Sequence, residues 1–171
     1  MTEPQSPDTS GTRTHQTGVS LIEVLIAVFV LAFGILGIAA MQAGALRNNQ
    51  GAFEQSAAVF LTHSILDAMR ATMQPDATGV LFVRPGYTTN GFICQSADIP
   101  TIADPLVESD LSLWFQNIQN NLNGGADDGS ACGKIECDAT DPNLCTVSVQ
   151  WDNSRSLGGN QAQIVSTRSR L

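Results

Sequence analysis

Residues 24–41 read Val-Leu-Ile-Ala-Val-Phe-Val-Leu-Ala-Phe-Gly-Ile-Leu-Gly-Ile-Ala-Ala-Met, with no polar or charged side chain. These 18 residues reach the length of a membrane-spanning helix. Extended back to Val19, the segment has 23 residues, and as a helix it would rise about 34 Å, slightly more than the hydrocarbon core of a bilayer. Its one charge is Glu23. A carboxylate at the centre of such a helix costs about 2.5–3.5 kcal/mol on insertion scales, so this residue requires an explanation.

The rest of the composition limits the function classes. The chain has 171 residues, a formal net charge of −8 and 43% hydrophobic residues, which suits one domain of ordinary size. Only eight Lys and Arg are spread over it, too few for a stripe that neutralises a run of phosphates, so nucleic acid is excluded as a partner. Because much of the apolar content lies in one N-terminal block, a soluble cytoplasmic enzyme is disfavoured.

Three processing schemes fit the apolar segment. It could be a Sec signal, with Arg13 as a thin positive region and Ala43-Gly44-Ala45 as the cleavage site. It could be an uncleaved single-pass anchor. In the third scheme the preceding segment is removed, since residues 1–18 are polar, rich in Thr, Ser, Gln and Pro, and without periodicity.

The junction of these segments favours the third scheme. Thr17-Gly18 is followed by Val19-Ser20-Leu21-Ile22-Glu23 and then the apolar run. This pattern resembles the class III signal of type IV pilins and of the pseudopilins of type II secretion, although their usual first mature residue is Phe. The resemblance implies cleavage after Gly18 by a membrane prepilin peptidase, N-methylation of Val19, and anchoring in the inner membrane.

Glu23 has a physical role in the same scheme. A carboxylate near a helix N-terminus is favoured by the helix dipole and by a nearby amine. In the pilin family this Glu is thought to neutralise the new α-amine of a neighbouring subunit in the filament core. An ion pair between subunits in an apolar medium selects one register, because leaving it unmatched is expensive. The alternative is an interfacial Glu that extends to the aqueous phase.

The helix is predicted to continue beyond the membrane segment. Over Gln42–Met73 apolar residues recur at steps of three and four, which indicates an amphipathic half that packs on a head domain. Pro75-Asp76 is expected to end it. The predicted stripe, expected to be core, consists of Leu46, Phe53, Ala57, Phe60, Leu61, Ile65, Ala68 and Met69.

The remainder predicts a small α+β head. Short strands are expected at 80–83 and 162–167, and alternation at Cys145, Val147, Val149 and Trp151 gives the clearest strand, 145–151. Asp104-Pro105 begins a second amphipathic helix that ends at 123–125, and an irregular acidic loop is expected after it. The predicted stripe of that helix is Val107, Leu111, Trp114, Ile118 and Leu122.

Four cysteines lie in this head: Cys94, Cys132, Cys137 and Cys145. An even number after the membrane segment favours a periplasmic disulfide framework, with three possible connectivities. A zinc site is the competing interpretation, but no CxxC spacing is present.

Sites for catalysis, metals or cofactors are not indicated. The acidic residues of 127–141 lack calcium-loop spacing and suit a solvated loop. His63, Ser64 and Asp67 resemble a triad only in composition, without a nucleophile elbow. We therefore expect no enzyme, no cofactor and no metal.

Three further sequence segments resemble motifs of one group of pilins. Ile65-Leu66-Asp67-Ala68-Met69-Arg70-Ala71, the Trp114 helix with its Gly-rich loop, and Thr146–Trp151 resemble motifs of PilV-type minor pilins. This resemblance implies a fold with a long N-terminal helix on a small antiparallel sheet. It divides the chain into a leader (1–18), a transmembrane or filament-core helix (19–41), its amphipathic half (42–74) and a periplasmic head (75–171).

The same resemblance implies a structural function. Minor pilins of this group prime pilus assembly with other minor pilins and the major pilin, and sit at the pilus tip where an adhesin docks, supporting twitching motility and adhesion. The alternatives are a minor pseudopilin of type II secretion and a Sec-exported, disulfide-bonded binding domain released at Ala45.

Overall fold

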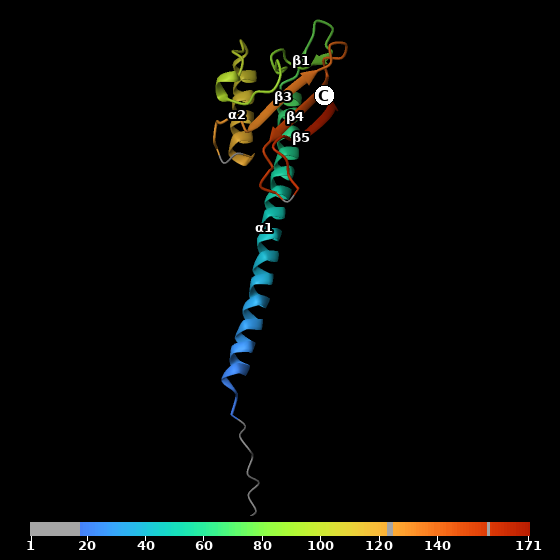
Figure 1. The fold of residues 1–171 in the computed structure, drawn as a ribbon. Helices are drawn as coiled ribbons and strands as arrows, with labels where there is room; N and C mark the ends of the chain where they lie inside the picture. Colours follow the sequence, from blue (N-terminus) through green and yellow to red (C-terminus); the bar gives the residue numbers. More distant parts are fainter. Residues whose placement is uncertain (1–17, 123–124, 157) are drawn as a thin grey trace, which may run out of the picture. The chain divides into compact units, whose positions relative to one another are not determined.

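The computed structural model describes residues 18–122, 125–156 and 158–171 (Figure 1). Most of the predicted leader, and the 123–124 part of the predicted helix end, lie outside these residues. The chain divides into two compact units, residues 1–41 and 42–171. In chain order the elements are α1 (Leu21–Ala71), β1 (Gln74–Pro75), β2 (Leu81–Phe82), a short 3-10 helix (Ser96–Asp98), α2 (Pro105–Leu122), β3 (Ala131–Cys137), β4 (Leu144–Trp151) and β5 (Gln163–Arg170).

The head in the second unit contains an antiparallel sheet in the order β3-β4-β5. The β3–β4 register runs from Ala131 opposite Trp151 to Cys137 opposite Cys145. The β4–β5 register is equally regular, from Leu144 opposite Arg170 to Trp151 opposite Gln163. A separate two-stranded ribbon pairs β1 with β2. Together with the two disulfides, these elements confirm the α+β, pilin-like fold.

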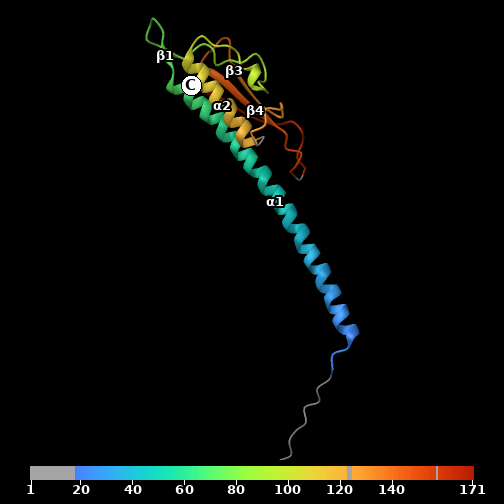
Figure 2. The same cartoon turned by 90° about the vertical axis from the view of Figure 1, so that its left-hand side faces the viewer.

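The C-terminal part of α1, whose buried residues begin at Gly51, and α2 cover the same face of this sheet (Figure 2). The inner face carries alternating β4 residues, which are buried as their spacing predicts. All five members of the predicted α2 stripe are buried too. As predicted, Asp104 caps α2, since its Oδ1 accepts a hydrogen bond from the Leu106 amide at 3.0 Å.

Two glycines permit close packing in the head. A Cβ at Gly133 in β3 would lie 2.6 Å from the Trp114 ring of α2. A Cβ at Gly51 in α1 would lie 2.2 Å from the Ser156 hydroxyl oxygen. The absence of a side chain therefore lets α2 rest on the sheet, and lets the β4–β5 loop lie against α1.

Three predictions about the head were wrong. Leu46, Phe53 and Phe60 are exposed, not core, because the helix has a second apolar face that periodicity cannot distinguish from the buried one. The buried side chains of α1 also include Glu54, a charged residue that is not part of the predicted apolar stripe. Part of the expected acidic loop is strand β3, which alternation does not reveal because its inner face uses Ala131 and Gly133.

Candidate functional site

The N-terminal segment places its polar groups at the start of α1. The Ser20 carbonyl accepts hydrogen bonds from the amides of Glu23 at 3.0 Å and Val24 at 3.3 Å. Glu23 is thus in the first turn of the helix, where free amides and the dipole favour a carboxylate. Gly18 precedes the helix and is exposed, with open space where a Cβ would lie. Among the described residues, none covers Gly18.

The apolar residues that follow are not covered by any other part of the described chain. Every residue from Leu21 to Met41 is exposed. In the described part of the chain, one helix, α1, is long and apolar enough to cross a membrane, and its apolar window is unburied. A surface of this kind is stabilised only when lipid or another apolar surface removes it from water.

The second unit has exposed apolar residues of its own on α1. Leu46, Phe53 and Phe60 recur every seven residues, and each is more than 60% exposed. Residues seven apart lie on nearly the same side of a helix. We call these three residues the α1 ridge.

The opposite face of this part of α1 is fastened to the head by two tryptophans. The Trp114 indole of α2 donates a hydrogen bond to the Leu61 carbonyl at 2.9 Å. The Trp151 indole of β4 donates to Glu54 at 3.2 Å. Glu54 is 4% exposed and has Arg155 3.7 Å away. No sequence pattern indicated this buried carboxylate, because Trp151 and Arg155 are about a hundred residues away along the chain.

A second hydrogen-bonded group ties the C-terminal end of α1 to α2. The Tyr87 hydroxyl donates to Asp110 of α2 and lies 3.0 Å from the Thr72 hydroxyl. Burial, with the hydrogen bond to Asp110, raises the pKa of Tyr87, so it remains protonated. Arg84 donates to the Thr72 carbonyl and to Asp104, both at 2.7 Å, and its hydrogen bond lowers the pKa of Asp104.

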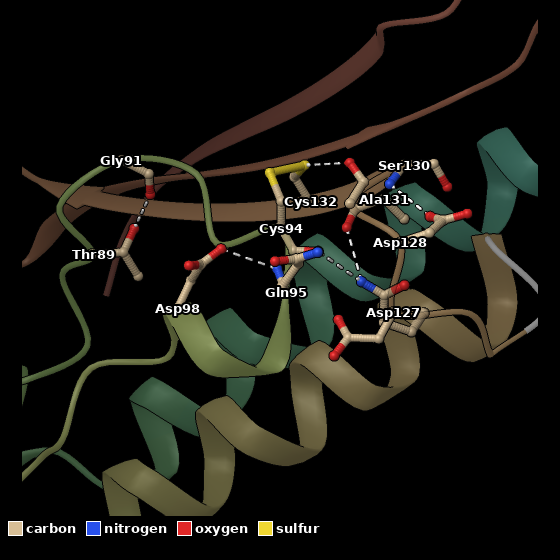
Figure 3. Close-up of a disulfide and its surroundings, with 12 residues drawn as sticks. Thr89, Gly91, Cys94, Gln95, Asp98, Asp127, Asp128, Ser130, Ala131 and Cys132 are labelled. Atoms are coloured by element: carbon tan, nitrogen blue, oxygen red, sulfur yellow. Dashed lines mark hydrogen bonds between the residues drawn. A yellow bond between two sulfur atoms is a disulfide. The ribbon is translucent and has the colours of Figure 1, made fainter.

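The four cysteines form two disulfides, and the structure selects one connectivity. Cys94 pairs with Cys132, which fastens the segment before the 3-10 helix to the start of β3 (Figure 3). Cys137 pairs with Cys145, directly opposite it at the end of the β3–β4 hairpin. Both bonds lie in the head.

The other candidate groups have local partners. Asp127 accepts hydrogen bonds from Ser96, with its amide at 3.0 Å. Asp138 accepts from Thr140, whose hydroxyl holds the pKa of that carboxyl below its usual value. On α1, His63 is exposed, and Asp67 pairs with Arg70 at 2.7 Å. Within residues 18–122, 125–156 and 158–171, no cluster of three potential metal ligands occurs.

Comparison with known families supplies the decisive observation. Residues 13–39 match the prokaryotic N-terminal methylation motif. The chain is type IV pilin-like. Neither a curated protein nor a solved structure gives a significant match.

The methylation motif indicates the role of the exposed apolar segment. A pilin-like protein is processed by a prepilin peptidase, is anchored in the inner membrane by its apolar helix, and then assembles with other pilin-like subunits. Its role is structural and not enzymatic. The exposed apolar residues from Leu21 to Met41 overlap the matched motif, which is consistent with anchoring in the inner membrane before assembly.

Proposed function

We propose that this pilin-like protein is a minor pilin of the type IV pilus, of the PilV type. It belongs to the minor-pilin complex that primes pilus assembly and sits at the filament tip. There it contacts other minor pilins and the major pilin and offers a position for an adhesin. In this role it supports twitching motility and adhesion.

The observation that carries the minor-pilin proposal is that all three segments with PilV-like motifs contribute contacts between α1 and the rest of the head. Asp67 and Arg70 of the first segment pair on α1, and Arg70 also donates to Ser169 of β5 at 2.7 Å. Trp114 of the second and Trp151 of the third both hydrogen-bond to α1. Residues that motivate the PilV resemblance are thus the ones that hold α1 to the head, which supports a shared architecture.

Maturation in this proposal begins at the exposed N-terminal junction. The peptidase cuts after Gly18, and Val19 becomes the N-methylated first residue. The accessibility of Gly18 supports this, since a peptidase must reach the bond that it cuts. Cleavage leaves a new α-amine a few residues before Glu23.

Assembly then transfers the apolar helix from lipid to a bundle of neighbouring helices. We propose that Glu23 pairs with the α-amine of an adjacent subunit, which fixes the axial register because an unmatched charge is costly in an apolar medium. The α1 ridge extends the contact beyond the membrane segment, since its three side chains face solvent in the isolated chain. A cytoplasmic ATPase supplies the work of extraction.

A minor pseudopilin of type II secretion has the same methylation motif and is the second candidate. Deleting the gene and assaying both processes distinguishes the two. The minor-pilin proposal predicts loss of twitching and presence of the protein in sheared pili, with exoprotein release unchanged. Loss of exoprotein release with normal twitching would assign the protein to the secretion system instead.

A further inference from the structure

The two edges of the β3-β4-β5 sheet differ in how they are covered. At the β3 edge, Ile93 exchanges backbone hydrogen bonds with Gly133 at 2.8 and 2.9 Å. Nearby, the Thr89 amide donates to the Ile135 carbonyl at 2.9 Å, and the Ile135 amide donates to the Thr89 hydroxyl at 3.1 Å. The disulfide in Figure 3 fastens this covering segment. The chain thus closes this edge itself.

The β5 edge is open. The Leu171 amide donates to the Asn143 carbonyl at 2.8 Å and continues the β4–β5 register. Antiparallel hydrogen bonding alternates, so the odd-numbered residues of β5 bond to β4. The backbone groups of Ile164, Ser166 and Arg168 therefore point away from it. Within the described residues, the amides of these three form no hydrogen bond to backbone elsewhere.

This edge has only one of the devices that normally prevent strand addition. β5 has eight residues without proline, and its pairing with β4 runs without a bulge. Natural edges are usually shortened, bulged, interrupted by proline, or charged. On β5 the only such device is charge, since the side chains of Arg168 and Arg170 are 63% and 75% exposed. A long, regular edge of this kind suits pairing with an extended segment.

The charge at the edge indicates the chemistry of that segment. The chain has a net charge of −8 and only eight Lys and Arg. Three of these cations nevertheless gather at β5: Arg168 and Arg170 are part of the strand, and Arg70 donates a hydrogen bond to Ser169. Arg168 and Arg170 reach Asp138 at 3.8 Å and Asp141 at 3.0 Å. Exposed pairs of this kind are weak, so carboxylates from a partner can replace them. A second copy of the chain would bring the same cations to the interface.

We propose that the open edge of β5 binds an extended acidic segment of a partner protein, which adds a fourth strand to the sheet. Its backbone pairs with Ile164, Ser166 and Arg168. Carboxylates at alternate positions of the segment face Arg168 and Arg170 on the solvent face of the sheet. This docking surface is separate from the α1 surfaces that pilin assembly uses.

Hydrogen exchange of the full-length protein in detergent micelles tests the proposal. The probe is a ten-residue peptide that alternates glutamate with valine, and its control replaces glutamate with lysine. We expect the acidic peptide to slow exchange of the β5 amides at 164, 166 and 168 about tenfold or more. Equal protection by the lysine peptide, or no protection at millimolar acidic peptide, would overturn the proposal. So would protection that rises with protein concentration alone, which would assign the edge to a second copy.

Two matched pairs of variants identify the contacts. Ser166→Pro removes an outward amide and leaves the bonds to β4 intact, so peptide affinity should fall about tenfold or more, whereas Ser166→Ala should bind within about twofold of the parent. Arg168→Gln with Arg170→Gln should weaken binding and reduce its salt dependence, whereas Arg47→Gln on α1 should not. Unchanged binding by the arginine variant, whose backbone edge is intact, would overturn the acidic character of the partner even if Ser166→Pro failed to fold.

Discussion

The two halves of α1 belong to one helix but differ in what stabilises them. Residues 21–41 are exposed throughout and depend on lipid or neighbouring subunits to remove them from water. The half from residue 42 to Ala71 has one face buried against the head. Its buried residues are Gly51, Glu54, Ala58, Leu61, Thr62, Ile65, Leu66 and Met69. Mutations in the first half should therefore affect processing and assembly, whereas mutations in the buried face should affect folding of the head.

Gly18→Ala, just before the first half of α1, gives the largest expected effect. Prepilin processing should be blocked, so that full-length protein accumulates in the inner membrane, because the proposed cleavage follows this glycine. Immunoblotting of membrane fractions measures the size of the product. The head should remain folded with both disulfides, and a mature-sized product from the variant would contradict the proposed cleavage site.

Glu23→Ala should separate processing from assembly. The variant should be cut normally, but its incorporation into sheared pili should fall strongly, since the proposed register contact would be lost. Quantitative immunoblots of pili and membranes measure the ratio. Glu23→Asp, which keeps the charge, is the control and should retain part of the incorporation. Full incorporation of the alanine variant would contradict the proposed role of Glu23 in setting the subunit register.

The disulfides should affect only the head, and to different extents. In the chain-entropy model, the 38-residue separation of Cys94 and Cys132 corresponds to about 4 kcal/mol of stability, and the 8-residue separation of Cys137 and Cys145 to about 2.5 kcal/mol. Paired Cys→Ser variants compared by urea unfolding give these values. Peptidase cleavage should be unchanged in both. A larger loss of unfolding free energy on removing Cys137–Cys145 than on removing Cys94–Cys132 would contradict this order.

A matched pair of variants compares the two faces of α1 directly, and its exposed member has the smallest expected effect. Ile65→Ala should destabilise the head by about 3 kcal/mol, because the side chain is buried, whereas Phe60→Ala on the α1 ridge should cost about 0.5 kcal/mol or less. Both tryptophans lie in the head, so their fluorescence reports its unfolding alone. A loss of several kcal/mol for Phe60→Ala would place the ridge in the core and remove it as an assembly surface.

Sequence patterns predicted the elements with strong periodicity. The apolar run defined α1, steps of three and four defined α2, and alternation defined β4. Strand β3 was missed because Gly133, which accommodates Trp114, leaves no apolar alternation. The same limit applies to Phe53 and Phe60, since spacing identifies an apolar face but not its partner. The Glu54–Trp151 contact and the disulfide pairing depend on tertiary proximity, which one sequence does not contain.

The N-terminal sequence and intact mass of the protein from its native membrane test the central claim most directly. The proposed maturation predicts a chain that begins at N-methylated Val19 and retains the rest of α1 and both disulfides. A chain that begins after Ala45 would make the apolar segment a signal peptide. An uncut Met1 would make it a plain anchor. Either result would contradict the proposal that residues 19–41 serve as the assembly surface of a mature pilin-like subunit.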